Sequence, residues 1–132
     1  MSMSDPIGDM LSSIKNAITM KHNEVVISHS KMKESIVKLL LQEGFIKDYN
    51  VNEENKKKSL VIILKYTEDG EPVIRGLKRV SLPSRRRYIK PKDMPLVLGG
   101  LGTGIISTSK GLKTVKECKH LHIGGEYICQ LW

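Results

Sequence analysis

The chain has 132 residues, of which 39% are apolar and 27% charged, and 22 basic against 14 acidic residues give a formal charge of +8. This globular composition and length allow one domain or two small ones. The sequence has no run of about 18 apolar residues that would span a membrane and no start typical of a secretory signal. Two cysteines, Cys118 and Cys129, are too few for a disulfide framework, so free thiols in a reducing compartment are expected.

The first part of the chain predicts a helix followed by a short strand. Asp5 suits the cap of a helix, and Pro6 suits its first position. Apolar residues then recur with the spacing of one buried helix face, at Ile7, Met10, Leu11, Ile14, Ala17 and Ile18. The segment Glu24–Ser28 has the pattern of a strand.

A second helix and a hairpin are expected next. Ser30 is predicted to cap a helix over Lys31–Glu43, which Gly44 ends. The buried face of this helix is expected at Met32, Ile36, Leu39 and Leu40. Two strands, Phe45–Val51 and Leu60–Tyr66, flank a polar stretch that is predicted to be a mobile tip. The first half is therefore predicted to form two helices packed on a three-stranded sheet.

The second half is predicted to be mostly β, with short helices. Turn residues at Glu68–Pro72 mark a boundary that divides the chain into domains at residues 1–67 and 68–132. Thr114 and Glu117 match a capping box. Strands are expected over Val73–Val80, Arg86–Lys90, Thr103–Ser107 and Glu126–Leu131, and short helices over Met94–Leu98 and Val115–His120. The fold class is therefore α/β (α+β), with two small modules.

The positive charge is concentrated in the second half. Residues 1–66 carry 10 basic and 8 acidic side chains, whereas residues 67–132 carry 12 and 6. The segment Arg75–Lys92 holds eight basic residues and no acid. Such a cluster repels itself unless an anion accompanies it, and neutralising phosphates releases counterions. A solvated surface would explain scattered lysines, but Arg85–Arg87 beside Tyr88 favours a nucleic-acid partner.

Two motifs resemble those of enzymes. The glycine-rich run Gly99–Gly104 precedes a predicted strand, whereas a dinucleotide site needs its glycines after a strand and before a helix. Ser107 and Lys110 have the S-x-x-K spacing of a serine acyl-transfer enzyme, but the companion motifs are absent and the chain is much shorter than such enzymes. Acyl transfer by Ser107 and Lys110 is kept as an alternative that a covalent serine label would test.

A zinc-dependent binding module is a third hypothesis. Cys118, His120, His122 and Cys129 are ligand types, but their spacing lacks the paired C-x₂₋₄-C of structural zinc sites. An ordinary helix end and a buried strand cysteine explain these residues better. We therefore expect no metal site and no cofactor.

Three hydroxyl side chains precede a glycine at Ser107–Gly111. Hydroxyls both donate and accept hydrogen bonds, and RNA offers 2′-hydroxyls, phosphates and base edges in a shallow groove. The segment is equally well interpreted as an RNA contact and as a polar β-turn.

Several motifs together resemble the bacterial and organellar form of small-subunit ribosomal protein eight. The resemblance covers essentially the whole chain, and a hydroxyl turn followed by Gly-Gly-Glu at this separation is specific. The matching segments are Ser4–Ile7, Asp9–Leu11, Ile14–Ala17, Glu43–Ile46, Gly76–Ser81, Gly100–Gly102, Ser107–Gly111 and Gly124–Glu126.

The resemblance implies a structural protein, not an enzyme, that folds as two α/β modules. Members of the family bind the central domain of small-subunit rRNA and help to assemble the platform. They contact small-subunit proteins five and twelve, and some members also bind their own messenger. The implied location is a ribosome, in the bacterial cytoplasm or in an organelle.

The resemblance also implies contact residues. The main element is the hydroxyl turn, here Ser107, Thr108, Ser109, Lys110 and Gly111. Glu126 follows the double glycine, and its carboxylate would accept hydrogen bonds from base amino groups or orient the turn. The remaining implied contacts are Tyr88, Arg86 and Arg87, and the start of the second helix at Ser30, Lys31 and Lys33.

The chain departs from the family pattern in two places. Ser84 stands where a glycine is usual, and Arg85 and Arg87 occupy positions that are often apolar. The helix after the hydroxyl turn reads TVKECK where T-D-x-E-A-R is common, which weakens a contact role for that helix.

Overall fold

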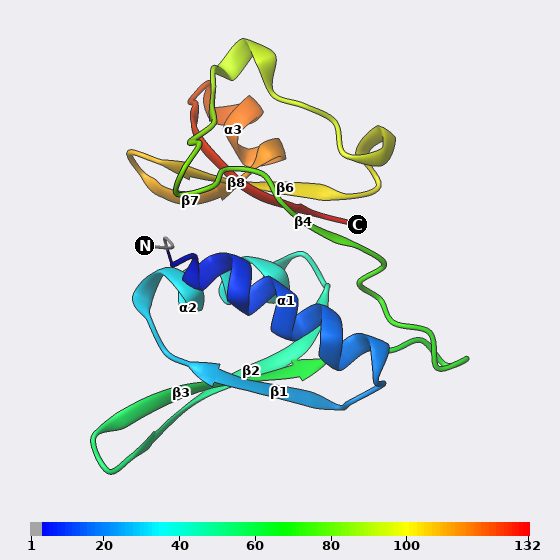
Figure 1. Ribbon diagram of the computed structural model, residues 1–132. Helices are drawn as coiled ribbons and strands as arrows, with labels where there is room; N and C mark the ends of the chain where they lie inside the picture. Colours follow the sequence, from blue (N-terminus) through cyan, green and yellow to red (C-terminus); the bar gives the residue numbers. More distant parts are fainter. Residues whose placement is uncertain (1–3) are drawn as a thin grey trace. The chain divides into compact units, whose positions relative to one another are not determined.

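The computed structural model describes residues 4–132, which form two compact units. The N-terminal unit is Asp9–Arg75, and the C-terminal unit combines residues 4–8 with Gly76–Trp132. Each unit has its own antiparallel sheet, with three strands in the first and five in the second (Figure 1). The predicted α+β fold class is confirmed. The domain boundary after residue 67 stays a prediction.

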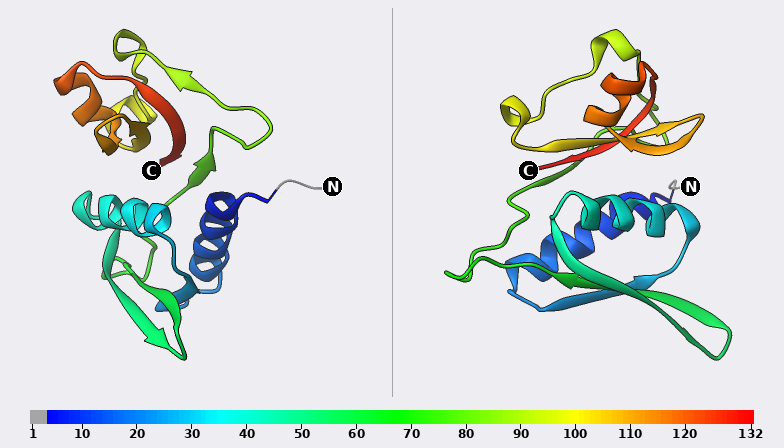
Figure 2. Two further views of the ribbon diagram at one scale, coloured as in Figure 1. Left: turned by 90° about the vertical axis from the view of Figure 1, so that its left-hand side faces the viewer. Right: turned by 180° about the vertical axis from the view of Figure 1, so that it is seen from behind.

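The N-terminal unit places two helices on one face of its sheet (Figures 1 and 2). The helices are α1 (Pro6–Thr19), which belongs to this unit from Asp9 onward, and α2 (Lys31–Gln42). The strands have the order β1 (Glu24–Ser28), β3 (Lys57–Leu64) and β2 (Ile46–Glu54). The apolar face predicted for α1 is buried at Met10, Leu11, Ile14 and Ala17. Within the part of the chain that the structure describes, no helix has the length and apolar character that a bilayer span requires.

The caps of α2 agree with the sequence. The Ser30 hydroxyl accepts a hydrogen bond from the Lys33 backbone N–H at 3.1 Å. At the other end, Gly44 has a φ of +79°, and the Phe45 N–H donates to the Leu40 carbonyl. This positive φ is the conformation for which glycine is preferred after a helix. The predicted burial of Met32 is wrong: its side chain is exposed, and Val37 is buried instead.

The hairpin between β2 and β3 is longer than predicted. The polar stretch predicted as a mobile tip pairs in register as far as Glu54 opposite Lys57. Asn55 and Lys56 form the two-residue turn, and both have a positive φ. Both faces of this part of the ladder are exposed, so no apolar alternation signals a strand. The asparagine at the first turn position is typical of such hairpins.

The C-terminal unit is a sheet with one helix against it (Figure 2). Its central strands are β6 (Thr103–Thr108) and β8 (Gly125–Leu131). The shorter strands β4 (Leu77–Arg79) and β5 (Tyr88–Ile89) both pair with β8, and β7 (Gly111–Thr114) pairs with β6. The helix α3 (Val115–Leu121) has the predicted capping box between Thr114 and Glu117. The core beneath it contains Met94, Ile106, Val115, Cys118 and Tyr127.

Two predictions for the second half are corrected, and one strand was not predicted at all. The strand expected over Val73–Val80 is shorter than predicted, because only Leu77–Arg79 (β4) pairs with β8. The helix expected over Met94–Leu98 is absent, and short 3₁₀ turns lie at Pro91–Asp93 and Leu98–Gly100. Two prolines, Pro91 and Pro95, favour turns over a regular helix here. The strand β7 was not predicted, because its four residues are too short for a period to appear.

Candidate nucleic-acid interface

The hydroxyl turn is the tip of the hairpin between β6 and β7. Thr108 pairs with Gly111 across the ladder, which leaves Ser109 and Lys110 as the two loop residues. Gly111 has a φ of +97°, a value that other residues rarely adopt. The Thr108 hydroxyl donates to the Gly111 carbonyl at 2.7 Å and accepts from the Lys110 N–H at 3.0 Å. The turn is therefore braced from within.

The other two hydroxyls of the turn are available. Within residues 4–132, the Ser107 and Ser109 side chains make no hydrogen bond. Ser109 is exposed and Ser107 is half-buried. Since every buried side-chain nitrogen or oxygen among the described residues has a partner, the Ser107 hydroxyl must also reach solvent. These two groups are thus free to donate to and accept from a ligand.

A row of three polar side chains crosses the sheet beside this turn. Tyr88 on β5 pairs with Glu126 on β8, and Glu126 pairs with Ser107 on β6. Directly paired residues point to the same face of a sheet. The neighbouring pair, Ile106 and Tyr127, points to the opposite face and into the core under α3. The row therefore lies on the face away from α3, and we call Tyr88, Glu126 and Ser107 the polar row.

A glycine permits the strands to approach at this row. At Gly125, an added Cβ would lie 2.1 Å from the carbonyl oxygen of Ser107. No side chain fits this distance without movement of backbone. The glycine before Glu126 thus fixes how closely β8 and β6 meet next to the polar row.

The Glu126 carboxylate is held by two donors. Its Oε2 accepts a hydrogen bond from the Ser81 hydroxyl at 2.5 Å and from Arg86 Nη1 at 2.9 Å. Burial raises the pKa of Glu126, but the hydrogen bonds from Ser81 and Arg86 outweigh it, so the pKa lies below its usual value. The carboxylate is therefore ionised at neutral pH.

The cationic segment next to the row is exposed. Arg85, Arg87 and Tyr88 are all exposed, and Tyr88 keeps 72% of its surface accessible. Arg86 differs because it forms an ion pair with Glu126, which raises the pKa of its guanidinium. Within residues 4–132, Arg85 and Arg87 form no ion pair. Arg85 and Arg87 are thus better placed than Arg86 to contact phosphates.

Three further predicted contact residues lie in the N-terminal unit. Ser30 caps α2 with its hydroxyl, and Lys33 Nζ donates to the backbone carbonyl and the hydroxyl of Ser28 at 3.1 and 3.0 Å. Lys31 is exposed. Of the two lysines, Lys31 is the one whose side chain has no hydrogen-bond or ion-pair partner among residues 4–132. The other predicted site residues all lie in the C-terminal unit.

One important residue of this site was missed from sequence. Ser81 is fully buried and touches both Glu126 and the backbone of Arg87. Serine is most often found at protein surfaces, and the residues beside Ser81 in the sequence do not indicate that it is buried. Its place at the end of the Gly76–Ser81 motif was the available signal.

The residues of the zinc hypothesis do not gather. Within residues 4–132, no group of three His, Cys, Asp or Glu side chains is placed to hold a metal ion. Cys118 and Cys129 are buried free thiols. Burial raises the pKa of Cys118, and it raises the pKa of Cys129 to about 12.

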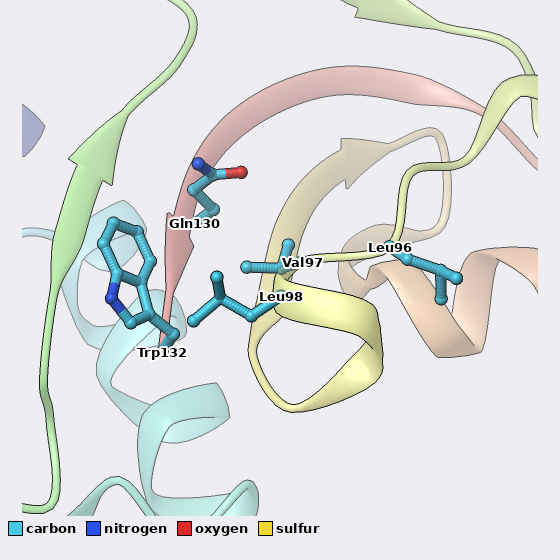
Figure 3. A pocket seen from close by; sticks show the side chains of 5 residues that line it. All are labelled: Leu96, Val97, Leu98, Gln130 and Trp132. Atoms are coloured by element: carbon cyan, nitrogen blue, oxygen red, sulfur yellow. The ribbon is translucent and has the colours of Figure 1, made fainter.

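The C-terminal unit also has an apolar cavity of about 160 Å³. Val97 and Leu98 lie beside the Trp132 ring, whereas Leu96 points away from it (Figure 3). Gln130 completes the lining, so the cavity holds no acid, base or nucleophile. Leu96 and Leu98 of this lining are exposed, and so is Leu101. The cavity offers a surface for apolar contact.

The sequence matches known proteins over nearly all its length. The model of a family described as ribosomal protein S8 matches residues 5–132. A relative named small ribosomal subunit protein uS8, from Thermodesulfovibrio yellowstonii, is 48% identical over 98% of this chain and 99% of its own. The protein of the same name from Rubrobacter xylanophilus is 49% identical over 98% of this chain and 98% of its own. The one from Clostridioides difficile is 47% identical over the full length of both chains.

Proposed function

Since the chain belongs to the ribosomal protein S8 family, we propose that it binds the central domain of small-subunit rRNA directly and helps to assemble the platform. As a member of this family it is a structural, non-enzymatic component of the small ribosomal subunit. The observation that carries the proposal is the polar row, with exposed arginines on the β5 side and the braced hydroxyl turn on the β7 side.

In the proposed interface, the arginines have a different role from the hydroxyls and the carboxylate. Arg85 and Arg87 contact phosphates, and this supplies affinity that depends on salt. The hydroxyls of Ser107 and Ser109 reach into the shallow groove of an RNA helix, where 2′-hydroxyls and base edges lie. Glu126 repels phosphate and accepts hydrogen bonds from base amino groups or ribose hydroxyls. Fit to one RNA structure therefore comes from the hydroxyls and the carboxylate.

The N-terminal unit adds a second contact in this proposal. Lys31 is exposed at the first residue of α2, next to the Ser30 cap. Ser30 and Lys33 act mainly by fixing the start of the helix, because their side chains already have partners within the unit. Lys31 then supplies the charge that meets a phosphate.

Protein partners are the second part of the proposal. Contacts with small-subunit proteins five and twelve follow from the family resemblance, and the exposed leucines Leu96, Leu98 and Leu101 offer an apolar surface for such a contact. A helix of the chain's own messenger would bind the same polar row if it adopted the fold of the rRNA site. The proposed location is a bacterial-type ribosome, in the cytoplasm or in an organelle.

Binding to defined RNA fragments tests the proposal. The full chain is titrated with a transcript of the rRNA central domain and, as a control, with an equally long transcript of the 5′ domain. We expect the central-domain transcript to bind on the order of a thousandfold more tightly. Hydroxyl-radical footprinting should show protection confined to one helical region. Equal affinity for the two transcripts would refute direct, specific binding.

A substitution at Arg87 tests the assignment of phosphate contacts. Arg87→Ala should weaken binding to central-domain and random RNA alike and reduce the slope of log K against log salt by about 0.7–0.9. Arg87→Lys keeps the charge and should leave the slope unchanged. The measurement is affinity at four or more salt concentrations. An Arg87→Ala slope equal to that of the native chain would show that Arg87 meets no phosphate.

A further inference from the structure

Ser81 joins three segments of the chain near the polar row through its hydroxyl and its backbone. The hydroxyl donates to Glu126 Oε2 at 2.5 Å and accepts from the Arg87 N–H at 3.0 Å. The Ser81 N–H donates to the Tyr127 carbonyl, and the Tyr127 N–H donates to the Arg87 carbonyl, both at 2.9 Å. The side chain of Ser81 has no exposed surface. The segment that follows β4, the residue before β5 and the start of β8 are thus joined at Ser81.

The chemistry at this position suits a hydroxyl in particular. A hydroxyl carries one donor and two acceptor sites, so it can serve a carboxylate and an N–H together. Alanine would leave the Arg87 N–H without this partner. A thiol of similar size would fill the space but donate and accept only weakly.

The contacts with Ser81 and Arg86 leave one oxygen of Glu126 for a ligand. Ser81 and Arg86 both bind Oε2, whereas Oε1 makes no hydrogen bond within residues 4–132. Because every buried side-chain oxygen among these residues has a partner, Oε1 must be accessible to solvent. The carboxylate is held by one oxygen, and it belongs to a residue paired with both Ser107 and Tyr88 on the same face of the sheet.

We propose that Ser81 is a positioning residue of the interface, which acts through Glu126 to aim one carboxylate oxygen at a hydrogen-bond donor of the RNA. This inference rests on the proposed function and names the chemistry of the contact. The donor is a base amino group or a ribose 2′-hydroxyl, since a phosphate oxygen would be repelled. Ser81 itself touches no RNA, because it is buried.

A double-mutant cycle separates positioning from stability. Ser81→Ala should weaken binding of the central-domain transcript about tenfold and leave the salt slope unchanged. In a Glu126→Gln background the same substitution should weaken binding less than twofold, because the group it positions is already altered. Equal losses in both backgrounds would mean that Ser81 supports the fold alone, and no loss in either would refute the inference.

A second variant and a direct readout guard against misfolding. Ser81→Cys replaces the hydroxyl with a slightly larger thiol, leaves no cavity, and should weaken binding in the same direction as Ser81→Ala while unfolding near the native temperature. In the free protein, NMR titration of the Glu126 side-chain carboxyl should show a higher pKa in both variants, although Arg86 and Arg79 still act on it. An unchanged carboxyl titration would overturn the inference.

Failure of the inference is distinguishable from failure of the proposed function. If the native chain binds the central-domain and 5′-domain transcripts equally, the proposed function is wrong and the role of Ser81 falls with it. If the native chain discriminates while both Ser81 variants bind as tightly as it does, the role of Ser81 alone is refuted.

Discussion

Replacing Gly125 with alanine should lower the free energy of unfolding by about 3 kcal/mol, at the upper end of the cost of overpacking. The added methyl group would lie 2.1 Å from the carbonyl oxygen of Ser107 and 3.2 Å from Ile106 Cγ2. The obstacle is backbone of the central strand β6, so it cannot move as a flexible side chain would. Urea unfolding, followed by the Trp132 fluorescence of the same unit, would measure the loss.

A matched glycine gives the control for this prediction. Gly99 lies in the same unit, and a Cβ added there meets nothing within 4 Å, although its φ is +63°. Gly99→Ala should therefore cost only the backbone strain, about 1 kcal/mol. If the two variants lost equal stability, the close approach of β8 to β6 would not be what requires Gly125. The Gly125 variant should also bind RNA poorly, because the polar row is displaced.

Removing both free hydroxyls of the turn, with Ser107→Ala and Ser109→Ala together, should weaken binding of the central-domain transcript by roughly 1–3 kcal/mol. This corresponds to a loss of about 5- to 150-fold in affinity. The salt slope should stay unchanged, since neither hydroxyl carries charge. Unfolding should also be little affected, because neither side chain makes a hydrogen bond within the described residues.

Two comparisons make this result specific. Ser84→Ala removes an exposed hydroxyl from the same unit and should leave affinity unchanged. Random RNA should bind the double variant as well as it binds the native chain. A loss that is the same for cognate and random RNA would show that the turn contributes general affinity and not fit.

Local signals in the sequence predicted the three α-helices well, but the short helix expected over Met94–Leu98 is absent. Ser30, Gly44 and the pair Thr114 and Glu117 mark helix ends through hydrogen bonds made within a few residues, so the sequence holds the whole cause. Strands depend on partners distant in the chain. The outer part of β2 and β3 was missed because both faces are polar, and β4 was overextended because apolar residues continue where pairing does not.

The members of the candidate site came from the family resemblance and stay a prediction, whereas their arrangement could not be derived from the sequence. The resemblance supplied Ser107, Tyr88 and Glu126, and the register then placed all three in one row. Arg86 was expected among the RNA contacts, and this stays a prediction, but the sequence did not show that its guanidinium also holds Glu126. Ser81 was missed because its role depends on burial, and burial of a serine is decided by tertiary packing.

The two buried cysteines make the chain convenient for site-directed labelling. Both thiols are inaccessible and protonated at neutral pH, so maleimides should spare them in the folded protein. A cysteine placed at the exposed position of Ser84, next to Arg85, would have neighbouring cations that favour its thiolate. A fluorophore attached there could follow docking onto RNA in real time without removal of either native sulfur.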